Sequence, residues 1–253
     1  MSIYTNTGLV KHAEMAFGLK TKYMWGGILR EITPAYIKQL KNVYGVNPAM
    51  GYTVQRWVEL FACSDKGYFG VDCVGLIKSY YWSGRPNGGT GSPKYASEEY
   101  PDVGAKTMFS QAKVKGKIKN IPEIPGLIVY SSNPVHVGIY IGKGQTIEST
   151  LGSRGDGVVK RPLDNLWSDW FQCSYIEYPE PEKLKAVKLD FDAKIRSIPS
   201  IKGAQVGFLA AGSKCVIVEG SDIIDPITKY TYVKLGGKDQ WIVKSAIHNG
   251  GNA

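Results

Sequence analysis

Cysteine and histidine are scarce in this chain of 253 residues, and their spacing excludes several kinds of site. The four cysteines, Cys63, Cys73, Cys173 and Cys215, are far apart, whereas zinc sites and redox motifs use close pairs such as Cys-x-x-Cys. We therefore expect no metal and no disulfide framework, which suits a reducing compartment. The chain also lacks a phosphate-binding loop and a dinucleotide fingerprint, so we expect no cofactor.

Long apolar runs are missing as well. No segment approaches the ~20 apolar residues of a membrane-spanning helix, so we expect no membrane insertion. Residues 1–6 have neither the basic nor the apolar region of a signal peptide, which predicts accumulation in the cytoplasm until the protein is released.

Basic residues outnumber acidic ones, but they are spread along the chain. Lysine and arginine number 31 against 22 acidic residues, a formal net charge of +9, yet they form no dense basic run. An excess of this kind favours anionic partners. Because neither a basic run nor a nucleic-acid-binding motif is present, we expect no nucleic-acid partner and favour an anionic cell wall.

The most informative stretch, residues 70–77, places Cys73 at the start of a predicted helix. Apolar residues over 76–82 recur at helical spacing, and the glycine-containing run 83–89 predicts the end of that helix. The positive end of a helix lowers the pKa of a thiol, and the thiolate is the nucleophile. The alternative is a buried cysteine that packs as a small apolar residue.

His136 is the candidate base. It begins a β-rich run, 136–142, that turns into a second run, 145–150, and the two predict a hairpin. Glu148 then lies near His136 across the strands, where a carboxylate would orient the imidazole. Each of these two residues alone fits an ordinary strand position. Together with Cys73 they predict a nucleophile, a base and an orienting group.

Three segments resemble the NlpC/P60 family of papain-like cell-wall peptidases: Tyr-Met-Trp-Gly-Gly at 23–27, Asp-Cys-Val-Gly-Leu at 72–76, and His-Val-Gly-Ile-Tyr-Ile-Gly at 136–142. The resemblance covers residues 1–180 and implies an α+β fold with a papain-like catalytic domain. It also implies that Cys73 is the nucleophile and His136 the base, with Glu148 as the third polar residue.

The same resemblance implies roles for three neighbouring residues. Tyr23 would direct its hydroxyl at the oxyanion of the tetrahedral intermediate, together with the backbone N–H of Cys73. Asp72 would contact the substrate, and Trp25 would line its binding site, with packing in the core as the alternative for this tryptophan.

Two departures from the family pattern stand out. Val74 replaces the usual serine, which puts a preference for a free peptide amino terminus in doubt. Residues 28–70 form an insertion with predicted helices at 34–40 and 54–60, and a segment this long is rarely a bare loop. We expect it to wall the substrate groove, or to buttress the fold.

A proline- and charge-rich stretch at 178–183 predicts a linker to a second domain, residues 184–253. Short β-rich runs at even spacing predict a small all-β barrel there. The order of these runs resembles a bacterial SH3-like (SH3b) domain, which implies cell-wall binding. Trp241, Tyr230 and Tyr232 are candidate ligand platforms, although we expect at least one of them to be buried in the barrel.

Together these implications predict a peptidoglycan hydrolase that cleaves a stem-peptide amide through a Cys73 thioester, with the γ-D-glutamyl to diamino acid bond implied by the resemblance. An N-acetylmuramoyl-L-alanine amidase is the alternative enzyme, and a non-catalytic cell-wall-binding protein is the alternative outside catalysis. The two-domain layout without a signal peptide resembles a phage endolysin of Gram-positive hosts. Its partners would be peptidoglycan and the Gram-positive cell wall, and it would remain in the host cytoplasm before release.

Overall fold

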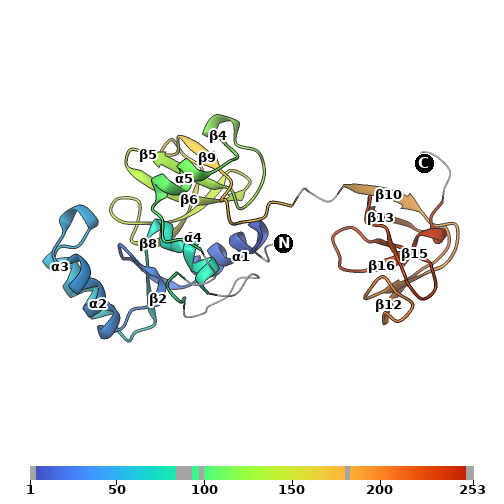
Figure 1. The fold of residues 1–253 in the computed structure, drawn as a ribbon, viewed down its shortest axis with the longest axis horizontal. Coiled ribbons are helices and arrows are strands. Elements are labelled where there is room, and N and C mark those ends of the chain that lie inside the picture. Colours follow the sequence, from blue (N-terminus) through green and yellow to red (C-terminus); the bar gives the residue numbers. More distant parts are fainter. Residues whose placement is uncertain (1–3, 84–92, 97–99, 180–182, 249–253) are drawn as a thin grey trace. The chain divides into compact units, whose positions relative to one another are not determined.

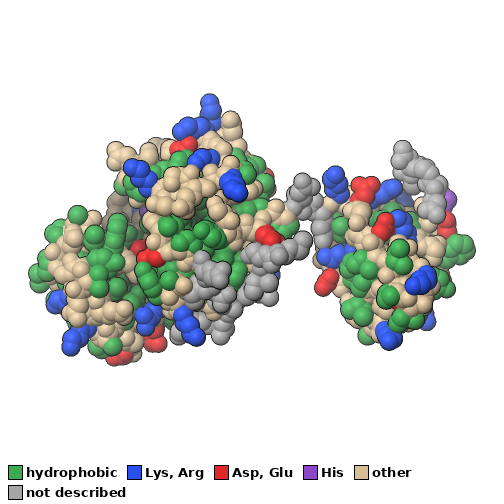
Figure 2. All heavy atoms as spheres, viewed as in Figure 1, with side chains coloured by type: hydrophobic (Ala, Val, Ile, Leu, Met, Phe, Trp, Pro, Cys, Tyr) green, Lys and Arg blue, Asp and Glu red, His purple; other side chains and the backbone are tan. Residues whose placement is uncertain are grey.

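The computed structural model describes residues 4–83, 93–96, 100–179 and 183–248. The chain divides into two units, Met1–Pro179 and Glu180–Ala253 (Figure 1). Parts of the expected turn at 83–89 and of the expected linker at 178–183 lie outside the described residues. Within the described residues, no helix is long and apolar enough to span a bilayer. On the face drawn in Figure 2, lysines and arginines are scattered over both units instead of gathering in one stripe.

A six-stranded antiparallel sheet forms the centre of the first unit, in the order β4-β9-β5-β6-β7-β8. Alternation along β6 sends Val137 and Ile139 to the larger buried cluster and Tyr140 to a smaller cluster around Trp167. The strands are β4 (Lys115–Lys117), β5 (Ile128–Ser132), β6 (Val135–Gly142), β7 (Gln145–Thr150), β8 (Gly157–Pro162) and β9 (Asp169–Phe171).

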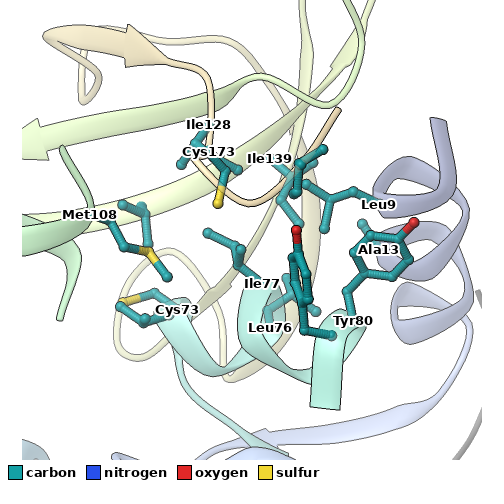
Figure 3. Close-up of a cluster of buried hydrophobic side chains, with 14 of the residues drawn as sticks. Leu9, Ala13, Cys73, Leu76, Ile77, Tyr80, Met108, Ile128, Ile139 and Cys173 are labelled. Carbon is teal, nitrogen blue, oxygen red and sulfur yellow. The ribbon is translucent and has the colours of Figure 1, made fainter. Parts of the chain in front are cut away.

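Helix α4 (Cys73–Trp82) is the central helix of this unit, and all ten of its residues are buried. In Figure 3 its Leu76, Ile77 and Tyr80 point into the cluster that α1 (Asn6–Phe17) and the sheet also line. A side chain at Gly75 would place its Cβ 1.8 Å from the Gly27 carbonyl oxygen, so only glycine lets the helix approach the backbone at Gly27 this closely. A short helix, α5 (Ala105–Gln111), adds Met108 to the same cluster.

A smaller sheet, β1-β3-β2, leads into α4. Strand β1 (Lys20–Tyr23) runs parallel to β3 (Tyr68–Val71), and β2 (Ile28–Glu31) runs antiparallel to it. Between β2 and β3 lie α2 (Pro34–Tyr44) and α3 (Val54–Cys63), which begin after the side-chain caps Thr33 and Thr53 and share a core of their own.

The expected helical insertion at 28–70 is therefore only partly helical. Its helices lie where the sequence predicts them, but its two ends are strands that complete the small sheet. A 3₁₀ turn, η1 (Pro48–Met50), joins the helices, and a second, η2 (Ile118–Asn120), follows β4. The short strands escape sequence reasoning because four residues show too little alternation to distinguish a strand from a loop.

The second unit pairs its strands in the order β12-β11-β16-β15-β14, with a separate antiparallel pair β10-β13, around its own apolar core. Tyr232 is buried in this unit, whereas Tyr230 is exposed and Trp241 is half-buried. The SH3-like barrel remains a prediction. The elements are β10 (Leu184–Lys188), β11 (Ala193–Arg196), β12 (Gln205–Leu209), β13 (Lys214–Val218), β14 (Ile223–Ile224), β15 (Thr231–Lys234), β16 (Trp241–Val243) and η3 (Lys244–Ala246).

His12 on α1 is buried against α4, where its Nε2 lies 2.8 Å from the Ser79 hydroxyl. Burial lowers its pKa from 6.5 to about 4, so the folded protein keeps this imidazole neutral while the unfolded chain takes up a proton. The unfolded state therefore binds more protons between those two values, and stability falls as the pH drops through that window.

We expect this group to contribute a loss of about 2 kcal/mol in unfolding free energy between pH 7.5 and pH 5. Urea unfolding of the wild type and of His12→Gln at both pH values measures it, because glutamine keeps a polar contact with Ser79 and does not titrate. Equal losses of stability in the two proteins would contradict the assignment.

Candidate active site

The start of α4 lies where β6 and β7 separate. Among residues 135–150, β6 pairs with β7 only from Ile139↔Ile147 to Gly142↔Gln145, whereas β5 pairs with β6 as far as Val135. The Ser149 hydroxyl on β7 donates to the Val71 carbonyl at 2.8 Å, next to the start of the helix. The residues that connect β3 to α4 therefore lie beside the ends of β6 and β7 that do not pair with each other.

Cys73 is the first residue of α4, and its side chain is 8% exposed. Burial, followed by the charge of Asp72, raises the pKa of its thiol to about 12. Hydrogen bonding by the backbone N–H of Val137 on β6 and by those of Val74 and Cys73 itself lowers that pKa only in part. The expectation that the helix terminus would leave a thiol of low pKa is wrong here, because desolvation outweighs the backbone dipoles. A neighbouring base must take the proton.

His136, next to Val137 on β6, is bound to Glu148 on β7. Its Nε2 lies 2.5 Å from Glu148 Oε2, and its ring stacks on Trp167 with centroids 5.5 Å apart. Burial would raise the pKa of Glu148, but hydrogen bonds from His136 and Arg154 hold it below its ordinary value. An ionised carboxylate only accepts, so Nε2 carries the hydrogen and Nδ1 is the basic nitrogen.

Glu148 has a second partner that sequence reasoning missed. Arg154, in the loop from β7 to β8, donates to Glu148 Oε1 from Nε at 3.1 Å and from Nη2 at 2.6 Å. Its Nη1 donates to Asp164 at 2.8 Å. The only signal in the sequence is a charged residue in the glycine-rich run 151–157, and nothing there identifies its partners.

A cleft of about 450 Å³ opens beside the thiol. Tyr23, Trp25, Asp72 and Cys73 all line it, as does Lys78, which pairs with Asp102. Burial, and the negative charge that Cys73 can carry, raise the pKa of Tyr23, so its hydroxyl stays protonated and can donate. Trp25 is 40% exposed, so its side chain lies at the cleft and not in the core.

Both carboxylate oxygens of Asp72 accept hydrogen bonds from backbone N–H groups. Oδ1 accepts from the Gly75 N–H at 2.5 Å and so caps α4, and Oδ2 accepts from the Gly26 N–H at 2.7 Å. Burial raises its pKa, although these hydrogen bonds oppose the rise. The contacts present in the structure therefore join α4, which begins at Cys73, to the segment that bears Trp25.

The segment between β2 and β3 holds the backbone of two aromatic residues of the cleft, Tyr23 and Trp25. Arg56 on α3 donates from Nη2 to the Tyr23 carbonyl at 2.7 Å and to Asp156 at 2.6 Å, and Asp156 accepts from the Tyr23 N–H at 3.0 Å. The Tyr52 hydroxyl donates to the Trp25 carbonyl at 2.7 Å. Tyr44 of α2 also lines the cleft. This segment thus both buttresses the site and forms part of its wall.

No family model and no curated protein matches the chain. Among solved structures, the chain is similar to the peptidoglycan hydrolase RipB from Mycobacterium tuberculosis, with 20% identity and a TM-score of 0.37 over 68% of this chain and 65% of RipB. The chain thus spans less than two thirds of the RipB chain.

A second similar structure is the P60 domain of antigen MAP1204 from Mycobacterium avium subspecies paratuberculosis, with 20% identity and a TM-score of 0.36 over 68% and 98% of the two chains. A third, Ly7917, has 12% identity and a TM-score of 0.30 over 94% and 92%. At these values the likenesses do not place the chain in a family.

Proposed function

We propose that this chain is a cysteine-dependent peptidoglycan hydrolase. One observation carries the proposal. The Cys73 thiol at the start of α4 forms part of the cleft wall and lies against the backbone of Val137, the residue after His136. His136 Nε2 is in turn held by the buried Glu148. Acyl transfer requires a nucleophile, a base and an orienting group, and we assign these roles to Cys73, His136 and Glu148. The three segments that resemble NlpC/P60 peptidases point to the amides of peptidoglycan as the substrate class.

In the proposed reaction, His136 Nδ1 takes the Cys73 proton as the sulfur attacks an amide carbonyl carbon. Because burial raises the pKa of the thiol, Cys73 stays protonated until His136 takes its proton. The Tyr23 hydroxyl and the Cys73 N–H stabilise the oxyanion. The imidazolium then gives its proton to the departing amine, and a thioester forms.

Hydrolysis of the thioester completes the proposed cycle. His136 takes a proton from a water molecule, whose oxygen attacks the thioester carbon. As the C–S bond breaks, the imidazolium returns that proton to the sulfur. The products are a carboxylic acid and the restored Cys73 thiol. Asp72 keeps the helix and the Trp25 segment in register through its two hydrogen bonds, and Trp25 gives the substrate an apolar wall.

The bond that we propose is γ-D-glutamyl to diamino acid within the stem peptide. Val74 lines the cleft at the position where the resemblance has serine, so a substrate without a free peptide amino group remains an alternative, as for an N-acetylmuramoyl-L-alanine amidase. We further propose that the second unit is an SH3-like wall-binding domain and that the protein acts as an endolysin on Gram-positive walls. The separate core of that unit and its exposed Tyr230 support this role.

The test is the loss of turbidity of purified Gram-positive walls with the wild type, with Cys73→Ala and with Cys63→Ala as a cysteine-matched control. We expect clearing by the wild type and the control only, because the thiol of Cys73 is the nucleophile. Mass spectrometry of the released fragments identifies the bond. A new D-glutamate γ-carboxyl end indicates the endopeptidase, and a freed muramic lactyl carboxyl indicates the amidase.

Two outcomes would contradict the proposal. Clearing by Cys73→Ala as fast as by the wild type would remove Cys73 as the nucleophile. A lack of clearing by any of the three proteins on several wall types, with sedimentation of the protein onto those walls, would indicate a non-catalytic wall-binding protein.

A further inference from the structure

The loop between β7 and β8 carries two charged residues that reach different parts of the site. Arg154 binds Glu148, and Asp156 binds Arg56 together with the backbone of Tyr23. These two residues are separated only by Gly155, which has a φ of +140°, a backbone conformation that side chains disfavour. The short loop between β7 and β8 therefore contacts both Glu148 and the backbone of Tyr23.

Glu148 is fully buried, so its ionisation depends on its partners. An unpaired carboxylate in such a place would take up a proton. Arg154 directs two N–H groups at Oε1, which leaves Oε2 to accept from His136. Each oxygen thus has its own partner, and the carboxylate plane is determined by both.

Arg154 is itself held in place. Asp164 accepts from its Nη1 at 2.8 Å, so the guanidinium lies between two carboxylates. The Arg161 side chain on β8 donates to the Arg154 carbonyl at 3.3 Å. The charged groups directly bound to Glu148 are His136 from β6 and Arg154 from the loop, with Asp164 and Arg161 behind them.

We propose that Arg154 is a positioning residue for the reaction, keeping Glu148 ionised so that the carboxylate fixes the tautomer of His136. With Glu148 ionised, Nε2 of His136 carries the hydrogen and Nδ1 is free to take the thiol proton. With Glu148 protonated, its O–H would donate to Nε2 and the hydrogen would move to Nδ1. The proposal rests on the proposed function for the role of His136.

Alkylation of Cys73 by iodoacetamide tests this proposal without any wall substrate. Its rate is measured as a function of pH by mass spectrometry of the Cys73 peptide, which separates it from the other three cysteines. We expect Arg154→Gln to move the acidic limb of the profile to higher pH by about one unit or more, because the charge that opposes protonation of Glu148 is lost.

Lys160→Gln is the matched control, since it removes one positive charge from an exposed position on the adjacent β8. Its profile should superpose on that of the wild type. If the acidic limb of Arg154→Gln coincides with those of the wild type and of Lys160→Gln, the proposal is overturned. If Arg154 had only a structural role, Arg154→Gln would lower the amount of folded protein, which thermal unfolding measures, and would leave the acidic limb of the alkylation profile in place.

Arg154→Lys decides the matter if the glutamine variant does not fold. Lysine keeps the charge but cannot donate two N–H groups to one oxygen in a fixed plane. Because the charge that keeps Glu148 ionised remains, we expect the acidic limb of Arg154→Lys to stay close to that of the wild type, and a limb moved to higher pH by about one unit or more would overturn the proposal. Failure of the wild type to clear walls would instead contradict the proposed function, and the alkylation profiles would still test Arg154.

Discussion

Replacing His136 by asparagine should slow wall hydrolysis by about 10²- to 10⁴-fold, the usual contribution of a general acid and base. Arg154 still donates to Glu148 Oε1 in this variant, so the buried carboxylate keeps a charged partner. Asparagine cannot take the proton of a thiol whose pKa burial raises to about 12. The loss therefore comes from chemistry and not from an unsatisfied charge.

The measurement is the initial rate of turbidity loss by His136→Asn, with thermal unfolding to show that the variant is folded. His248→Asn is the matched control, because this exposed histidine lies in the second unit and its side chain binds Asp190. A rate for His136→Asn within threefold of the control would exclude His136 as the base.

Replacing Arg56 by methionine should cost about 3 kcal/mol of unfolding free energy, the lower end for breaking a buried ion pair. The Arg56 side chain is 7% exposed, and it donates to Asp156 at 2.6 and 2.8 Å and to the Tyr23 carbonyl at 2.7 Å. Its loss leaves Asp156 with Lys22 as its remaining charged partner. It also removes the side-chain contact with the Tyr23 carbonyl, while the contact of Asp156 with the Tyr23 N–H remains. Hydrolysis should fall as well, because Tyr23 lines the cleft beside Cys73.

Urea unfolding followed by tryptophan fluorescence measures this cost, since five of the six tryptophans lie in the first unit. Lys41→Met, an exposed position on α2, removes the same charge and should change stability little. The double variant with Asp156→Asn should lose less than the sum of the single variants, because the uncompensated carboxylate is gone. Strict additivity would contradict a direct Arg56–Asp156 interaction.

Several features of the site follow from short stretches of sequence. The helix at Cys73 was predictable because the apolar spacing over 76–82 is regular and a glycine-containing run follows it. The proximity of His136 and Glu148 was predictable because a tight turn joins their strands. Both depend on contacts between residues that are close in the chain.

The tertiary structure decided the rest. Arg56 and Asp156 are 100 residues apart, and only the packing of α3 beside β1 and the β7–β8 loop brings them together at Tyr23. The pKa of Cys73 also follows from packing, because the desolvation that raises it exists only once α4 is buried against the sheet. The sequence by itself predicted which groups would carry the proposed chemistry, through local periodicity and the turn of the hairpin. Burial and long-range ion pairs, which no local pattern encodes, determined their ionisation and their orientation.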